Sequence, residues 1–151
     1  MNSALMFSKA SDEWSTPQDV YDGLFVEFLF DLDVAATAEN AKCPNWLGLD
    51  NGHDALCSSW GLYGDHVWCN PPYSKCREFV AKAAAERLRG VLTVMLIPSR
   101  TDTRYFHEHL WADSIHAARP GIELRFVKGR LKFGGQKNCA PFPSMVVVFR
   151  P

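Results

Sequence analysis

The sequence of 151 residues contains no apolar stretch that approaches the roughly 20 residues of a membrane-spanning helix. Its first residues, MNSALMFSKASDEW, also lack the basic start and the long apolar core of a secretory signal peptide. We therefore expect no membrane span and a cytoplasmic protein.

Metal and disulfide patterns are missing as well. The five cysteines form no C-x-x-C pair, and their odd number argues against a disulfide framework. The five histidines show neither metal-ligand spacing nor the arrangement of a catalytic triad. The sequence therefore predicts reduced thiols and no metal site.

Repeats and low-complexity segments are absent, and the chain has the length of one ordinary domain. Hydrophobic residues make up 47% of it and aromatic residues 13%, which is enough for a packed core and argues against disorder. We expect residues 1–13 to form a flexible lead and residues 14–151 to form a single domain.

The first half of the chain has few basic residues, and the second half has few acidic residues. Residues 1–66 hold eleven acidic and two basic residues, a net charge of −9, whereas residues 67–151 hold six and fourteen, a net charge of +8. Such a split suggests a polyanionic partner or a bipartite site. The alternative is a pair of solvated faces that attract each other.

Hydrophobic periodicity predicts an α/β domain. Helices are predicted over 16–28, where Thr16 would be the N-cap and Pro17 the first helical residue, and over 74–90 and 104–114. Strands are predicted over 28–36, 66–69, 90–98, 121–133 and 144–151. Residues 37–65 should be loops with one short helix. Strands that alternate with helices favour a parallel sheet, with a possible antiparallel pair at the end of the chain.

The stretch HVWCNPPYS, residues 66–74, ends a core strand with unusual rigidity. A following proline holds Asn70 extended, and Pro71 and Pro72 cannot rotate about φ. The loop therefore fixes the Asn70 amide oxygen, the Pro71 carbonyl and the Tyr73 ring. Two acceptors can take both N–H groups of an exocyclic amino group, which directs its lone pair at an electrophile while the ring stacks on Tyr73. The alternative is a rigid strand exit without a function.

NPPY resembles the catalytic motif of amino-directed methyltransferases that use S-adenosylmethionine. With STPQDVYDGL and DLDVAA before it and GRLKF after it, and with HDAL between, residues 14–150 look like the phage-type, Dam-like DNA N6-adenine methyltransferases. The resemblance implies a trimmed Rossmann-like fold, mostly parallel, with an antiparallel strand at the C-terminal end. It implies methyl transfer from S-adenosylmethionine to N6 of a flipped-out adenine in duplex DNA, which leaves S-adenosylhomocysteine and needs no metal.

The same resemblance assigns roles to individual residues. The catalytic loop is Asn70, Pro71, Pro72 and Tyr73. The cofactor residues are Ser15, Thr16 and Pro17 at its methionine part, Asp33, Val34, Ala35 and Ala36 after the first strand, Asp54 at its adenine amino group, and Asn70. Because Asp31 and Asp33 alternate along a strand, we expect only Asp33 to point into the site.

A basic stretch suits the expected substrate. Methylating a base inside a duplex requires flipping it out, and the phosphate backbone has to be held meanwhile. No acidic residue occurs from 124 to 151. The expected DNA contacts are Arg100, Lys128, Arg130, Lys132 and Lys137, with Phe133 packing near the target base. A plain basic loop is the alternative.

Two departures from the family pattern stand out. The glycine-rich cofactor loop (FxGxG) is missing, so that Ala35 and Ala36 are the small residues available. Only 29 residues separate Ala36 from His66, which is short for two further strands with their helices, and we expect a trimmed sheet. The acid that binds the cofactor ribose is not identifiable, although Asp50 is a candidate.

Other functions stay open from the sequence. An RNA or protein-glutamine methyltransferase would present the same N–H donors to this loop, and a catalytically dead DNA-binding homologue would need no cofactor loop. The sequence does not specify the recognised DNA site or distinguish a monomer from a homodimer. No separate target-recognition domain fits into 151 residues.

Overall fold

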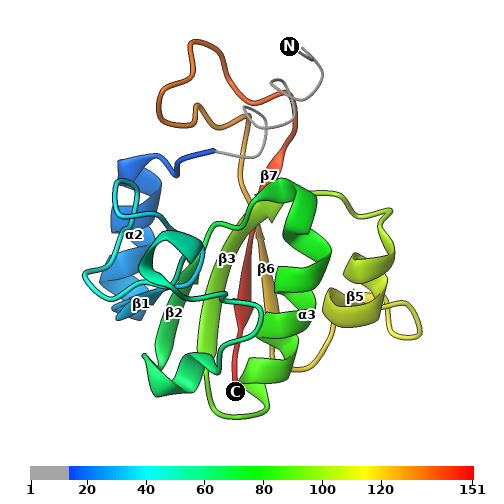
Figure 1. Ribbon diagram of the computed structural model, residues 1–151. Helices are drawn as coiled ribbons and strands as arrows, with labels where there is room; N and C mark the ends of the chain where they lie inside the picture. The colour runs from blue at the N-terminus through cyan, green and yellow to red at the C-terminus, as the bar shows by residue number, and fades with distance from the viewer. Residues whose placement is uncertain (1–13) are drawn as a thin grey trace, which may run out of the picture.

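A computed structural model describes residues 14–151, and the expected lead, residues 1–13, lies outside the described residues. The described chain contains a five-stranded sheet in the order β1-β2-β3-β7-β6 (Figure 1). The strands are β1 Leu32–Asp33, β2 His66–Cys69, β3 Leu92–Pro98, β6 Ile122–Phe126 and β7 Ser144–Phe149. β1, β2 and β3 are parallel, whereas β7 runs antiparallel to both β3 and β6. The expected mostly parallel sheet is therefore a mixed sheet.

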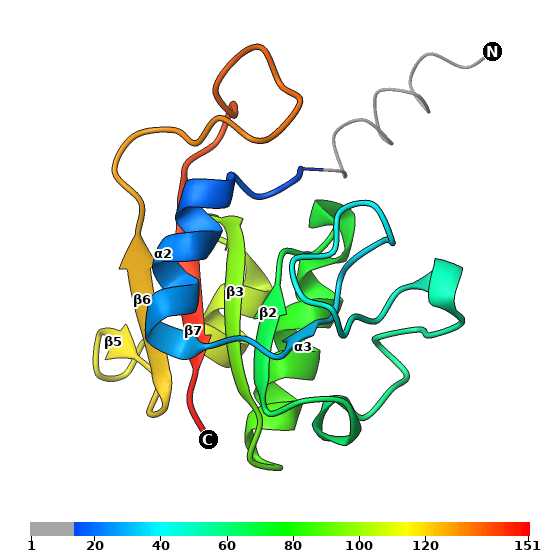
Figure 2. The same ribbon diagram turned by 90° about the vertical axis from the view of Figure 1, so that its left-hand side faces the viewer.

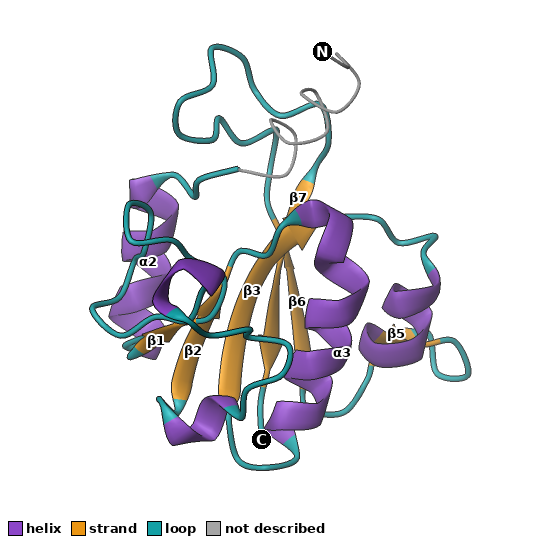
Figure 3. Ribbon diagram, in the orientation of Figure 1, coloured by secondary structure: helices purple, strands orange, loops and turns teal. Residues whose placement is uncertain are grey.

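The remaining elements are short, apart from two helices (Figure 3). These helices are α2, Gln18–Phe28, and α3, Cys76–Arg87. Single turns form η1 Leu49–Asn51, η2 Trp60–Leu62, η3 Tyr73–Lys75 and the π-helical η4 Phe106–Leu110. A small hairpin pairs β4 Trp111–Ala112 with β5 Ala117–Ala118. No helix among residues 14–151 has the length and apolar character needed to cross a membrane.

The two helices cover opposite faces of the sheet (Figure 2). On β3, Val94 and Leu96 belong to the core that includes residues of α2, and Met95 and Ile97 belong to the core that includes residues of α3. Successive side chains of a strand point to opposite faces, so a strand that is apolar at every position must be covered on both. The apolar run at 90–98 predicted this central position.

The start of α2 differs from the expectation. Pro17, with ψ 133°, is the N-cap residue, and no side chain caps the helix. Thr16 as N-cap is therefore wrong, because its side chain is buried in the wall of the cavity described below. At the other end, Leu29 adopts a left-handed conformation with φ 53° and stops the helix.

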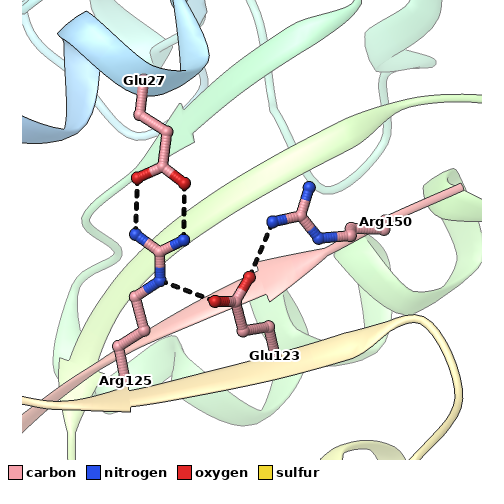
Figure 4. A network of polar contacts seen from close by, with 4 residues as sticks. All are labelled: Glu27, Glu123, Arg125 and Arg150. Atoms are coloured by element: carbon pink, nitrogen blue, oxygen red, sulfur yellow. Dashed lines mark hydrogen bonds and ion pairs between the residues drawn. The ribbon is translucent and has the colours of Figure 1, made fainter.

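A network of charged side chains ties α2 to the far edge of the sheet (Figure 4). Arg125 of β6 donates two hydrogen bonds of 2.6 Å to Glu27 of α2 and one of 2.9 Å to Glu123. Arg150 donates to the second oxygen of Glu123 at 2.7 Å. Both guanidinium groups lie over the Phe28 ring, at 5.3 and 5.7 Å from its centroid. The network thus holds the end of α2 that is remote from Pro17.

The sheet is trimmed as expected between β1 and β2. Within 37–65 only Trp46 bridges to the sheet, beside Asp33, and two short 3₁₀ helices replace the expected single helix. The helix predicted over 104–114 is shorter than expected: residues 104–110 are helical, mostly as the π-helical turn, and the helix ends where Trp111 begins pairing with Ala118. The strand predicted over 121–133 ends at Phe126, and residues 127–143 form a long loop.

Candidate active site

A cavity of about 620 Å³ opens beside the carboxyl ends of β1 and β2. In an α/β sheet with parallel strands this edge is where ligands bind. The lining includes residues 14–16, 33–37, 47–50 and 53–56, together with Asn70 and Pro72 from the loop after β2. Segments that lie far apart in the sequence therefore share one cavity.

Nearly all of the expected cofactor residues meet in this cavity. Pro17 is the exception, since it does not contribute to the wall. The eight that do are Ser15, Thr16, Asp33, Val34, Ala35, Ala36, Asp54 and Asn70. The structure thus brings together residues of four motifs that only the family resemblance had linked, namely STPQDVYDGL, DLDVAA, HDAL and NPPY. Their individual roles stay predictions.

Asp33 is a buried carboxylate at the end of β1, with 3% of its surface exposed. It accepts hydrogen bonds from the backbone N–H groups of Ala35, at 3.2 Å, and Lys42, at 3.0 Å. Burial raises the pKa of Asp33 to about 6, although both N–H groups act to lower it. Asp31 is exposed, accepts N–H bonds from elsewhere in the chain and does not line the cavity. Of these two aspartates, only Asp33 can therefore place a negative charge inside the cavity.

The side-chain amide of Asn70 is held in one orientation. Its Nδ2 group donates to the backbone carbonyl of Trp14. Its Oδ1 atom is buried and has no hydrogen-bond partner among residues 14–151. A buried acceptor without a partner costs about 1–3 kcal/mol. The amide thus keeps one acceptor available for a donor that comes from outside the described chain.

The prolines hold the rest of this loop. Pro71 is buried, and Pro72 has φ −55° and ψ 128°, an extended conformation. The Pro72 carbonyl accepts the N–H of Lys75 at 2.8 Å, which closes the η3 turn. The rigid exit that the sequence predicted therefore continues directly into the turn that carries Tyr73.

Three aromatic rings contact the ring of Tyr73. Trp14 lies nearly parallel to it, with centroids 6.4 Å apart and an angle of 15°, and Phe142 and Phe133 meet it edge-on at 5.2 and 6.2 Å. The Tyr73 hydroxyl is buried without a hydrogen-bond partner in the described chain, and burial raises its pKa. Phe133 is 1% exposed, so it faces Tyr73 and not the solvent. A base that stacks on Tyr73 has to displace one of these rings.

The expected DNA-contacting cations all lie on the surface. The loop of residues 127–143 stands at the same end of the sheet as the start of α2 and the N-terminal end of α3 (Figure 1). None of the five side chains forms an ion pair within residues 14–151, and all five residues are exposed: Arg100, Lys128, Arg130, Lys132 and Lys137. Their charge is therefore available to a partner.

Sequence reasoning missed part of the cavity wall. Gly48 approaches the first-strand loop so closely that a Cβ atom there would lie 2.0 Å from the Ala36 carbonyl oxygen. Gly48, from the segment that follows the first-strand loop in the sequence, thus supplies the small residue that a glycine-rich cofactor loop would otherwise contain. Lys42 and His53 also line the cavity, and so does Asp50, the candidate for the cofactor ribose. The sequence offered one signal for this part of the wall, the glycine Gly48 in the stretch NWLG, residues 45–48.

Comparisons with known proteins show which family the chain resembles. Residues 4–151 match the profile of the family described as DNA N-6-adenine-methyltransferase (Dam). The chain is 37% identical over 98 residues to a DNA N-6-adenine-methyltransferase of Escherichia phage T1, a match that covers 64% of this chain and 40% of that protein. It is 33% identical over 155 residues to a DNA N-6-adenine-methyltransferase of Haemophilus phage HP1 (strain HP1c1), covering 95% and 83%.

Proposed function

Because this chain belongs to the DNA N-6-adenine-methyltransferase (Dam) family, we propose that it transfers a methyl group from S-adenosylmethionine to N6 of an adenine flipped out of duplex DNA. The match over residues 4–151 confirms the family that the sequence motifs led us to expect. As the N6–methyl bond forms and the sulfur–methyl bond breaks, the reaction leaves S-adenosylhomocysteine, and N6 then loses one proton to solvent; no metal is involved.

We infer that the sheet is a trimmed Rossmann-like methyltransferase sheet. Three adjacent parallel strands, helices on both faces and a cavity at the carboxyl ends of β1 and β2 support this inference. The bridge between Trp46 and Asp33 takes the place of a further strand at the β1 edge.

The unpartnered Oδ1 atom of Asn70 carries the proposal. An adenine N6 group has two N–H donors; one would bond to Oδ1 and the other to the Pro71 carbonyl. Trp14 keeps the amide from turning, since its carbonyl accepts the Nδ2 hydrogen. With both N–H groups held, the lone pair of N6 is directed away from the ring and can attack without a general base. Tyr73 stacks on the base once a neighbouring ring has moved.

The cavity suits the cofactor. Its volume lies within the range of about 300–1,000 Å³ that is usual for small-molecule sites. When bound, S-adenosylmethionine supplies a methyl group activated by a sulfonium charge. Asp33 gives that cation a buried negative partner, and Ala35 and Ala36 leave room for it. Asp54 is assigned to the adenine amino group and Asp50 to the ribose.

Replacing Asn70 tests the mechanism. We expect Asn70→Ala to lower turnover at least about 100-fold, because one orienting hydrogen bond to the reacting group is lost, while S-adenosylmethionine still binds. Turnover is measured as transfer of a labelled methyl group to duplex plasmid DNA, and binding by calorimetry. Asn70→Asp, which keeps the acceptor, is the matched control and should retain more activity. Methylation by Asn70→Ala at the normal rate would contradict the mechanism.

The same assay separates the alternatives. Label that enters RNA or a protein glutamine, and not DNA, would change the substrate and keep the chemistry. A wild-type protein that binds DNA but no S-adenosylmethionine would favour a homologue that has lost catalysis. Protection of the plasmid from restriction enzymes then reports which sites are methylated.

A further inference from the structure

The strand β6 forms one edge of the five-stranded sheet, and within residues 14–151 no strand pairs with its outer side (Figure 2). The opposite edge is shorter, since β1 has two residues and Trp46 bridges to its Asp33. Edge strands are commonly protected by lysine, proline or bulges, because their unpaired backbone groups can pair with another strand. The sequence of β6, IELRF, contains neither lysine nor proline. This edge is therefore available to a further strand.

The backbone groups that β6 directs outward belong to its even-numbered residues. The N–H of Val127 donates to the Ser144 carbonyl at 3.1 Å, and such hydrogen-bonded pairs alternate along an antiparallel ladder. Odd-numbered residues therefore direct their N–H and C=O groups to β7, and even-numbered residues direct theirs away from it. Within residues 14–151, one of the outward N–H groups is bonded, that of Ile122 to the Arg119 carbonyl at 2.9 Å. The outward residues are Ile122, Leu124 and Phe126.

A two-fold axis at Leu124 makes β6 complementary to a second copy of itself. Antiparallel pairing about this axis sets Leu124 opposite its own copy and Ile122 opposite Phe126, so that outward backbone groups face each other. Glu123 then lies opposite Arg125, and opposite charges across a strand pair are favourable. An axis at Glu123 or at Arg125 would instead set like charges opposite each other. The charges thus favour one register.

Both charged residues can make this contact although they already belong to the network of Figure 4. Arg125 uses three of its five N–H donors, two for Glu27 and one for Glu123. Glu123 accepts one hydrogen bond from Arg125 and one from Arg150, and a carboxylate has about four acceptor sites. Phe126 has 62% of its surface exposed, and an apolar residue opposite would cover its ring.

We propose that β6 is the contact between two copies of this chain, which join their sheets into one continuous sheet about a two-fold axis at Leu124. β6 runs parallel to β3, because β7 is antiparallel to both, whereas the two copies of β6 run antiparallel to each other. The cavities at the carboxyl ends of β1 and β2 therefore open at opposite ends of the joined sheet. Each copy keeps its own site, and the inference does not depend on the proposed function.

Sedimentation velocity tests the contact. The wild-type chain should change from monomer to dimer as its concentration rises through the micromolar range. Phe126→Lys should weaken self-association about tenfold or more, since a charge would then lie against the partner's Ile122. Leu62→Lys, at an exposed residue of η2, introduces the same charge and should dimerise like the wild type. Turnover per chain should be equal in all three proteins.

A self-cross-link tests the register. In a hydrogen-bonded antiparallel pair the Cα atoms lie about 5.5 Å apart, which is within the range of a disulfide. Once the exposed Cys57 and Cys139 have been replaced by serine, Leu124→Cys should form a disulfide with its own copy under mild oxidation. Phe126→Cys is the control and should not, because its two copies would be offset along the strands by about 13 Å.

A wild-type chain that stays monomeric over the whole concentration range would overturn the inference and leave the edge to a strand of another protein. Dimers of Phe126→Lys as stable as those of the wild type would place the contact elsewhere and overturn it too, as would cross-linking of Phe126→Cys in preference to Leu124→Cys. Reduced turnover of Phe126→Lys would contradict the separate sites. The melting temperature of each variant checks its fold.

Discussion

Asp33 is buried, and in the proposed function its carboxylate faces a cationic ligand. Its ordinary pKa of 3.8 rises to about 6 in the folded chain, where two backbone N–H groups only partly replace water. The folded state therefore favours the protonated acid. Its contribution to stability is fully present below pH 3.8 and is lost as the pH rises through about 6. Above that pH the buried charge costs free energy that a bound cation can offset.

Cofactor binding should consequently depend on pH. Below about pH 6 Asp33 is protonated, and a sulfonium ligand loses its partner, so the affinity for S-adenosylmethionine should fall about tenfold between pH 7 and pH 5. Binding near pH 6 should release a proton, which calorimetry in buffers of different ionisation enthalpy can count. 5′-Methylthioadenosine, which carries no sulfonium charge, is the control. Asp33→Asn that keeps the full pH dependence would contradict this assignment.

Residues differ in how far the sequence could predict their place. The chemical roles of Asn70 and Tyr73 stay predictions, but their positions on a rigid loop were predictable because the prolines that hold them are adjacent in the sequence. Lys42 and Gly48 were not, because their place in the cavity depends on how the loop between β1 and β2 folds back along Asp33 and Ala36. No periodic pattern encodes such a contact.

At the level of elements, the charged network on β6 has a testable role (Figure 4). Arg125 contacts Glu27 of α2 and Glu123 of its own strand, and its guanidinium covers Phe28. The network therefore stabilises the contact between helix and sheet across about a hundred residues of sequence. Exposed single ion pairs contribute little, whereas a bidentate arginine in a network contributes more.

Arg125→Met should lower the melting temperature by about 3 °C at low salt, because methionine keeps apolar packing on Phe28 but cannot make the ion pairs. The difference should shrink in molar salt, since screening weakens partly exposed pairs. Thermal unfolding followed by circular dichroism measures both effects. Arg77→Met, which removes a single exposed pair with Glu78, is the control and should have little effect. Equal changes in the melting temperature of the two variants would mean that the network stabilises the fold no more than a single exposed ion pair does.

Element boundaries show where local patterns fail. The strand expected over 28–36 shortens to Leu32–Asp33, since Leu29 closes α2 in a left-handed turn and the outer edge of β1 is paired only through the single bridge from Asp33 to Trp46. The pattern over 104–114 is amphipathic, yet the hairpin that begins at Trp111 interrupts it. In both places a tertiary contact overrides the local preference, whereas 90–98, which is apolar on both faces apart from Thr93, fits only a central strand.

At the level of the whole molecule, the proposed function explains the charge split between the two halves of the chain, because one half would bind a cationic cofactor and the other DNA. Three aspartates from the acidic half line the cavity that would hold a cationic cofactor. The basic half supplies exposed cations on the loop of residues 127–143, at the same end of the sheet (Figure 1). DNA held by that loop would lie close to Asn70. The alternative that the sequence left open is a plain basic loop, and in that case the positive charge of the loop would have no effect on DNA binding.

Neutralising the loop separates these two interpretations. A variant in which Lys128, Arg130, Lys132 and Lys137 are all replaced by glutamine should bind duplex DNA more weakly. If each cation contacts a phosphate, the slope of log affinity against log salt should decrease in magnitude by about 3–4. Fluorescence anisotropy over a range of salt concentrations measures that slope, and the affinity for S-adenosylmethionine should stay unchanged, because none of the four side chains lines the cavity.

Arg77→Gln, an exposed cation of α3, is the control and should leave the salt slope as it is. Because counterions are released only where a cation replaces them at a phosphate, the slope counts contacts and does not merely report net charge. A fourfold variant with the wild-type slope would place the DNA elsewhere, and Arg100 after β3 would then be the next cation to replace. A reduced slope with normal cofactor binding would instead assign the basic half of the chain to the DNA backbone.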